Sequence, residues 1–250
     1  MPTLANMQLH LASISLNNMG ISLLEQRAYR QAAATFKDSL LVMRQAIDSA
    51  EVLHDTTSIE CKIHQAAERL AKPLEDSPFP CIQLICLDDT FAHSIWRDAA
   101  VNHPSAVFPI RLGSSDAQGP DCLTTRDIDL NAAVILYNFA LAYSCLFQAS
   151  RTRSNAAQIS LKMHEIHLFD MSFLVIRNSC KDVGDTVSIF DGRLAFSVVI
   201  LRCIVRTRME LGQAQQASLF YEKLLEIEKI LLQLDKELLG DRAISVAAAA

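Results

Sequence analysis

Histidine, cysteine and carboxylate side chains stand close together at two places in the sequence, and each could support chemistry. In KMHEIH, His164 and His167 are three residues apart beside Glu165, so on a helix both imidazoles would lie on one face. Imidazole and carboxylate are zinc ligands, but a site here would need a further ligand from elsewhere. We therefore favour ordinary histidines, exposed to solvent or at the edge of the core.

The second place is CIQLICLDDTFAH, which contains Cys81, Cys86, Asp88 and His93. A thiol and an imidazole can act as nucleophile and base, but nothing here supplies an orienting group or an oxyanion hole. The sequence also lacks the patterns GxxxxGK[ST], GxGxxG, GxSxG and HExxH. We expect no catalytic residue, no metal site and no cofactor. The alternative is a metal-binding or cysteine/histidine-dependent enzyme with its site in residues 73–126.

Composition and charge narrow the class of protein. The chain has 250 residues, of which 50% are hydrophobic, so it can bury a substantial core. A net charge of −5, without clustered Lys and Arg, argues against nucleic acid as a partner. The apolar run at residues 188–208 is broken by Asp191, Arg193, Arg202 and Arg206, and we expect no membrane span. The cysteines are scattered without CxxC spacing, which favours free thiols in a reducing compartment, the cytoplasm or the nucleus.

Proline is concentrated in the middle of the chain and divides it into three parts. Residues 1–72 and 127–250 carry the 3.6-residue period of helices, and residues 73–126 read as an irregular insertion in one continuous domain. Within the insertion, the apolar runs 81–87 and 106–112 are either short strands or ordered loop. The predicted helices end near Glu25, run from about Tyr29 to Ala50 and from Ser58 to Lys72, and then cover 129–147, 154–176, 193–211 and 214–239, the last closed by Gly240.

Three helix pairs repeat an order of large and small residues. The first pair has Leu16, Asn18, Met19, Gly20 and Leu23, then Tyr29, Ala32, Phe36, Ser39 and Leu40. The second has Tyr137, Asn138, Phe139, Ala140 and Tyr143, then, after roughly five extra residues in the link, Ala157 and Leu161. The third has Leu201, Ile204 and Val205, then Gly212, Ala217, Tyr221 and Leu224.

This order resembles the tetratricopeptide repeat (TPR) over residues 12–45, 132–170 and 197–228. The resemblance implies an all-α fold, a short irregular solenoid of helix hairpins with a loop-rich insertion. Gly20 opposite Ala32, and Ala140 opposite Ala157, would let paired helices approach closely. The space beside these small residues would be filled by Phe36, Tyr143 and Tyr221.

The spacing of the pairs departs from that family. The place of Gly20 is taken next by Ala140 and then by Val205, much further apart than the period of about 34 residues. We therefore expect that the first pair does not stack directly on the second. The helix Ser58–Lys72 and the segment after it would fill a layer or form a lid.

The resemblance also implies a concave groove, lined by the first helix of each pair, in which a partner peptide or helix lies. Asparagine can bond an extended backbone as both donor and acceptor, and two arginines four residues apart would attract an acidic ligand. The groove residues that the motif indicates are Asn17, Asn18, Tyr137, Asn138, Arg202 and Arg206.

The sequence therefore predicts a non-catalytic protein–protein interaction module, an adaptor or complex-assembly subunit that binds a peptide or helix of a partner protein. Two alternatives stay open for the groove and the surface. The chain's own insertion could fill the groove, and exposed apolar surface could drive self-association.

Overall fold

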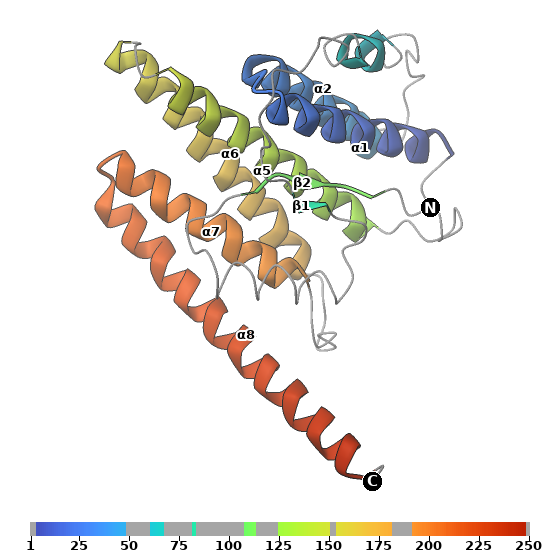
Figure 1. Ribbon diagram of the computed structural model, residues 1–250, viewed down its shortest axis with the longest axis vertical. Coiled ribbons are helices and arrows are strands. Elements are labelled where there is room, and N and C mark those ends of the chain that lie inside the picture. Colours follow the sequence, from blue (N-terminus) through green and yellow to red (C-terminus); the bar gives the residue numbers. More distant parts are fainter. Residues whose placement is uncertain are drawn as a thin grey trace. The chain divides into compact units, whose positions relative to one another are not determined.

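The computed structural model describes residues 4–48, 61–67, 82–83, 108–113, 125–150, 154–181 and 192–248. Most of these residues are helical (Figure 1), as the predicted all-α class requires. The chain forms two compact units, Met1–Cys86 with Val107–Ser179, and Leu87–Ala106 with Cys180–Ala250.

In its described residues, the first unit contains two helix pairs, the short helix at residues 61–67 and two very short strands (Figure 1). The described residues of the second unit form one helix pair. In chain order the elements are α1 (Leu4–Glu25), α2 (Tyr29–Asp48), β1 (Ile82–Gln83), β2 (Ile110–Arg111), α5 (Thr125–Ala149), α6 (Asn155–Lys181), α7 (Gly192–Glu210) and α8 (Ala214–Ala248), and residues 61–67 are also helical.

The predicted helices are present among the described residues, but several boundaries differ: α5 begins four residues earlier than predicted, at Thr125, and α6 and α8 end later, at Lys181 and Ala248. α1 and α2 meet between Glu25 and Tyr29 as expected, and residues 61–67 are the described part of the predicted helix Ser58–Lys72. Gly240 does not end α8, which continues to Ala248. A glycine inside a helix costs about 1 kcal/mol relative to alanine, and this cost alone does not terminate a long helix.

The small residues of the first pair act differently from what the sequence suggested. A Cβ atom on Gly20 would lie 2.7 Å from Cε1 of Phe36, so the residue opposite Gly20 is Phe36 and not Ala32. Gly20 makes room for a buried aromatic ring. Nearer the start of α1, Ser13 Oγ donates to the carbonyl of Ser39 (2.9 Å) and Ser39 Oγ donates to that of Ser13 (2.8 Å), which explains why position 39 is small and polar.

The first pair packs directly on the second, against our expectation. Phe36 of α2 meets Phe139 of α5 with ring centroids 6.5 Å apart. These rings share a buried cluster with Ile21 and Ala142, among others. The helix at residues 61–67 lies elsewhere, with Ala66 in a separate cluster on α1 and α2. The expectation was wrong because the long segment between α2 and α5 does not have to lie between the two helix pairs that it connects.

The second pair keeps the internal contacts of the first, at a register that the sequence analysis misplaced. Ser172 Oγ of α6 donates to the carbonyl of Ala133 on α5 (2.7 Å), as Ser39 does to Ser13 in the first pair. Counted from Ser172, buried Phe169 takes the place of Phe36, so Ala157 and Leu161 were wrongly matched. Both α5 and α6 are longer than α1 and α2 at the ends that the link between them joins. The residues of α6 that correspond to those of α2 therefore lie further from the link than the sequence analysis assumed.

The described helices of the second unit, α7 and α8, form a hairpin. The N–H of Gly212 donates to the carbonyl of Met209 (3.0 Å) and that of Gln213 to Arg208 (2.8 Å), which closes α7 with a glycine at φ 73°. Ala217 is buried as predicted, but Tyr221 is 50% exposed and does not fill the helix crossing. Its neighbour Leu224 is buried instead.

Among the described helices, α5 is long and apolar enough between Ile128 and Ala149 to cross a membrane, and 67% of its most apolar stretch is buried inside the structure. A buried core helix can have the same length and composition, so this feature alone is weak evidence for a membrane span.

Candidate functional site

The asparagine of α5 that the sequence singled out binds the backbone of an extended segment. Asn138 is fully buried, and its Oδ1 accepts the N–H of Ile110 at 2.8 Å. Its Nδ2 donates to the carbonyl of the same residue at 2.7 Å. One side-chain amide thus satisfies both backbone groups of Ile110, as a neighbouring strand would.

Asn18 of α1 makes the same paired contact two residues further along the segment. Its Oδ1 accepts the N–H of Leu112 at 2.9 Å, and its Nδ2 donates to the carbonyl of Leu112 at 2.7 Å. In an extended chain the backbone groups of alternate residues point to the same edge. Ile110 and Leu112 therefore present one edge to two asparagines from two different helices.

Two further predicted residues complete this groove, which we define as the surface formed by Asn17, Asn18, Tyr137 and Asn138. Asn17 Nδ2 donates to the carbonyl of Ile110 (3.3 Å), and its Oδ1 accepts from Asn138 Nδ2 (2.9 Å), which ties α1 to α5. Tyr137 Oη donates to the carbonyl of Phe108 (3.1 Å). The structure thus brings four of the six predicted site residues together around residues 108–112.

The occupant of the groove is the chain's own insertion. Ile110 and Leu112 are almost fully buried, and the opposite edge of the segment pairs in parallel with β1, Ile82 beside Ile110 and Gln83 beside Arg111. The open alternative, a groove filled from within, therefore describes this structure. Each of the two apolar runs holds a two-residue strand.

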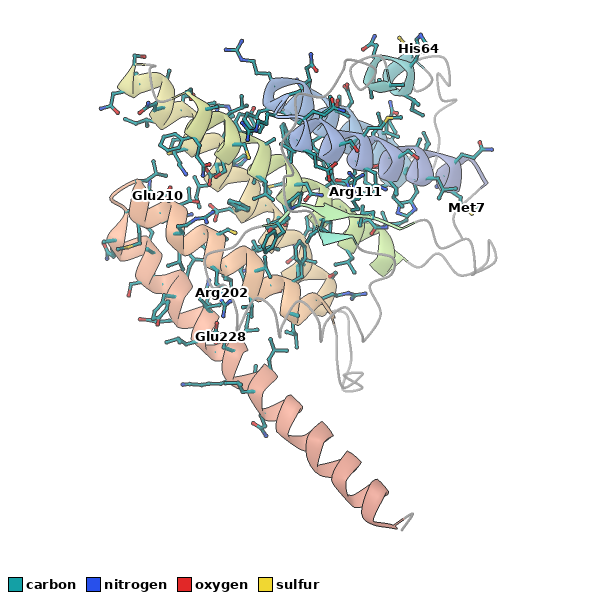
Figure 2. The ribbon with its side chains drawn as sticks, viewed as in Figure 1. Met7, His64, Arg111, Arg202, Glu210 and Glu228 are labelled. Atoms are coloured by element: carbon teal, nitrogen blue, oxygen red, sulfur yellow. The ribbon has the colours of Figure 1, made fainter. Side chains whose placement is uncertain are left out.

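Arg111 anchors the segment to α1 through its side chain (Figure 2). Its Nη2 lies 2.7 Å from Glu25 Oε2 and donates to Ser22 Oγ at 3.0 Å. Its Nη1 donates to the carbonyl of Asn18 at 3.2 Å. The sequence analysis missed Arg111, Ser22 and Glu25, because only the fold brings residues so distant in the chain together.

The two remaining predicted site residues lie on α7, in the second unit. Arg202 Nη2 donates to Glu228 Oε1 of α8 at 2.9 Å (Figure 2), and both side chains are about one fifth exposed (21% and 22%). Arg206 is partly buried. The guanidinium of Arg202 is thus engaged within its own hairpin, which weakens the argument for an acidic ligand.

The histidines of KMHEIH do not converge with Glu165. His164 is exposed, its ring stacks on Tyr143 with centroids 5.2 Å apart, and His167 is also exposed. Glu165 is buried in an ion pair with Lys162 at 2.8 Å. Within the described ranges no group of three His, Cys, Asp or Glu residues could hold a metal ion. Cys81, Cys86, Asp88 and His93 lie outside the described residues.

Cys145 is close to these groups but is a poor nucleophile. Burial, and secondly the charge of Glu165, raise the pKa of the Cys145 thiol to about 11. The thiol therefore stays protonated at neutral pH, while the thiolate is the reactive form. Cys145 behaves as a small apolar residue at the interface of α5 and α6.

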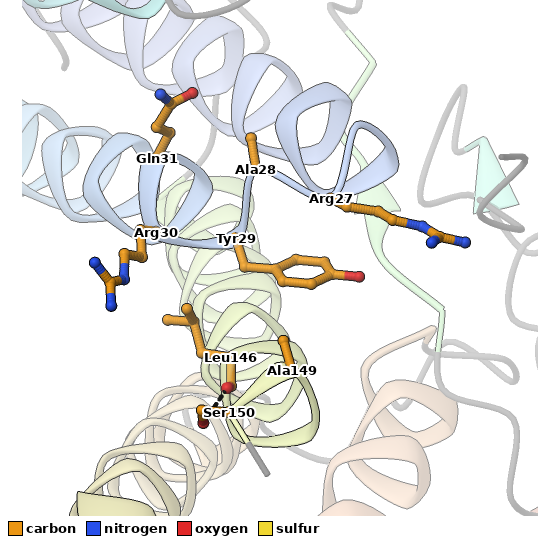
Figure 3. Close-up of a pocket in the computed structure, with 8 residues that line it drawn as sticks. All are labelled: Arg27, Ala28, Tyr29, Arg30, Gln31, Leu146, Ala149 and Ser150. Carbon is orange, nitrogen blue, oxygen red and sulfur yellow. Dashed lines mark hydrogen bonds between the residues drawn. The ribbon is translucent and has the colours of Figure 1, made fainter. Parts of the chain in front are cut away.

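An open pocket of about 420 Å³ lies at the turn between α1 and α2 (Figure 3). Tyr29, Leu146 and Ser150 form part of its wall. Its two cations, Arg27 and Arg30, point away from one another (Figure 3), so they do not converge on a ligand. Burial, and then the nearby Cys145, raise the pKa of Tyr29. The pocket offers no arrangement of groups that would perform chemistry.

Comparisons with known proteins add no family. A scan against family models, a search of curated proteins and a search of solved structures each returned no match. The likeness to TPR proteins therefore rests on the residues and contacts of this chain.

Proposed function

We propose that this chain is a non-catalytic protein-interaction module, an adaptor or assembly subunit, that binds an extended segment of a partner protein in the groove. One observation carries the proposal. Asn18 and Asn138 each bind both backbone groups of one residue, two residues apart along the same extended segment. This contact needs no particular side chain on the bound segment, so it suits recognition of polypeptide main chain.

We further propose that the helix pairs are TPR-like repeats of a short solenoid. The repeated turn supports this. Arg27 N–H donates to Leu24 and Ala28 N–H to Leu23, the pattern that Gly212 and Gln213 make at the end of α7. The packing of α2 on α5, second helix on the next first helix, is the arrangement expected of stacked hairpins.

The neutral character of the groove argues for binding and against catalysis. Its polar groups are carboxamides, a phenol and backbone atoms, none of which transfers a proton readily at neutral pH. They are held by one another and by the segment, so their arrangement is rigid. A rigid set of paired donors and acceptors favours affinity for a fixed backbone conformation.

A synthetic peptide library tests the proposal on the purified 250-residue chain. We expect a subset of peptides to bind, and Asn138→Ala to weaken them by about tenfold or more, because each loses a paired contact. Asn131→Ala is the matched control, since Asn131 lies on the same helix but bonds to His10. If no peptide binds, or if bound peptides are indifferent to Asn138→Ala, the proposed function is wrong.

A further inference from the structure

The resident segment shows what the groove accepts at each side-chain position. Ile110 is 1% exposed and Leu112 is 4% exposed, so the two residues whose backbone the asparagines hold also bury apolar side chains. A polar or charged residue at either place would lose its hydration without gaining a partner. The groove therefore requires apolar residues at these alternate positions.

The position between them is specific for a cation. The guanidinium of Arg111 meets a carboxylate, a hydroxyl and a carbonyl on one face of α1, all of them hydrogen-bond acceptors for it. Arg and Lys carry a positive charge that Glu25 attracts, and Arg alone can bond several acceptors in a fork. An acidic residue would place a second carboxylate against Glu25.

None of these contacts depends on which chain owns the segment. The bonds described above between the helices α1 and α5 and residues 108–112 are made by side chains of the helices or by Arg111 itself. A segment of another protein with the same pattern would make the same bonds. It would compete with a tethered occupant, whose effective concentration is in the millimolar range for a short linker.

Resting on the proposed function, we propose that the groove selects extended segments with the order apolar, basic, apolar. Ile110, Arg111 and Leu112 are the chain's own copy of that order, and a partner segment binds by displacing them. The partner is thus a protein with an exposed hydrophobic–Arg–hydrophobic stretch. The chain regulates its own affinity through the strength of the resident contact.

A labelled peptide with the sequence VFPIRLG, that of residues 107–113, is the probe, and its binding to the 250-residue chain is measured by fluorescence anisotropy. We expect it to bind the Arg111→Glu variant about tenfold more tightly than wild type, because Glu25 repels the altered resident segment and the groove is empty more often. A VFPIELG peptide should bind about tenfold more weakly than VFPIRLG to either protein. Glu25→Arg should reverse this preference.

Backbone recognition is tested separately with N-methylated peptides. Methyl groups on the nitrogens that correspond to Ile110 and Leu112 remove the donors to Asn138 and Asn18, and we expect a loss of about tenfold or more. Methylation at the nitrogen of Arg111, which points to the opposite edge, is the matched control and should cost less. Helicity measured by circular dichroism shows whether Arg111→Glu folds.

The outcomes separate the two proposals. The proposed function stands if VFPIRLG binds and the asparagine variants weaken its binding. In that case, equal binding of VFPIRLG and VFPIELG would show that the proposed selectivity is wrong. Equal binding of VFPIRLG to wild type and to Arg111→Glu would show that the proposed displacement is wrong. If VFPIRLG binds no variant, or binds without regard to Asn18→Ala and Asn138→Ala, both are wrong. If Arg111→Glu does not fold, the two peptides compared on wild type decide.

Discussion

The turn between α1 and α2 and the turn between α7 and α8 have the same hydrogen bonds, yet the hairpins that they close differ inside. Counted from these turns, Gly20 corresponds to Val205 and Phe36 to Tyr221. In the first hairpin a glycine leaves room and the ring is buried, whereas in the last a valine stands there and the ring is half exposed. We infer that the turn fixes which residues of the two helices face one another. The size of the residue where the helices cross then decides whether the aromatic ring opposite is buried or exposed.

The same correspondence contrasts the outer faces of the two first helices. Asn17 and Asn18 of α1 correspond to Arg202 and Cys203 of α7. The asparagines bond to a strand beyond their own hairpin, whereas Arg202 bonds to Glu228 within its own. Two hairpins with one turn and one register therefore have different capacities to bind an extended chain.

Replacing Gly20 by valine should have the largest effect on stability. The added atoms would overlap the ring of Phe36, which has no solvent-facing alternative, so we expect a loss of about 3 kcal/mol in the free energy of unfolding. Urea denaturation measures the loss. A second substitution, Phe36→Leu, should recover part of it, since the smaller side chain relieves the overlap.

The reciprocal change is Val205→Gly. We expect the free energy of unfolding to fall by only about 1 kcal/mol, the cost of glycine in a helix interior. The reason is that the Tyr221 ring is already half exposed and does not pack at this place. Equal losses for Gly20→Val and Val205→Gly would show that the crossing residue does not decide the place of the ring.

Replacing Asn18 of α1 by alanine should have the next largest effect on stability, confined to the segment at residues 108–112. Asn18→Ala leaves the N–H and carbonyl of Leu112 without their partners, at a cost of about 2 kcal/mol. Hydrogen exchange at the amide of Leu112 should accelerate accordingly. Cys203→Ala, at the corresponding place on α7, should leave that amide unchanged. Unaltered exchange in Asn18→Ala would contradict the paired contact.

Substituting the two residues with positive φ, one at each turn, should have a smaller effect on stability. Arg27 is held at φ 58°, a conformation that costs a non-glycine residue about 1 kcal/mol, and Gly212 has φ 73°. Gly212→Ala should therefore destabilise the protein by about 1 kcal/mol. Arg27→Gly should be neutral or slightly stabilising in thermal denaturation. Opposite signs would mean that contacts of the Arg27 side chain outweigh the backbone strain.

The ion pair of the last hairpin should have the smallest effect. A double-mutant cycle with Arg202→Met and Glu228→Gln should give a coupling of about 0.5 kcal/mol, because the pair is partly exposed to solvent. A coupling several times larger would indicate that Arg202 organises the hairpin as strongly as Asn17 and Asn18 organise theirs.

Local patterns predicted where the helices lie, because apolar residues recur at helical spacing between breaks such as the turns at residues 26–28 and 211–213, but they misplaced the end of α8. They failed where a decision depended on contacts between elements. Gly20 was correctly recognised as a place that needs little bulk, and Phe36 as a residue that fills the space nearby, but the direct contact of the Phe36 ring with Gly20 became evident only from the packing. Ser172 was the better guide to the register of α6, and its equivalence to Ser39 is visible only in the hydrogen bonds to Ala133 and Ser13.

The site divides in the same way. Asn17, Asn18, Tyr137 and Asn138 could be predicted because a repeat motif places them on the first helix of a pair. Arg111 could not, because an isolated short strand has no periodicity that reveals what it will lie against. Ile47 shows a further limit. It is an apolar residue of α2 but is 54% exposed, whereas Val42 and Ala46 of the same helix are buried.

The groove holds the main chain with carboxamides, which carry no net charge and do not titrate. Ionic strength therefore acts on this site chiefly through Arg111 and Glu25, whose attraction is screened over about 8 Å in physiological salt. Added salt would reduce the preference of the groove for a basic over an acidic residue, whereas the hydrogen bonds to the backbone would persist. Affinity and selectivity in this groove can thus be tuned independently of one another.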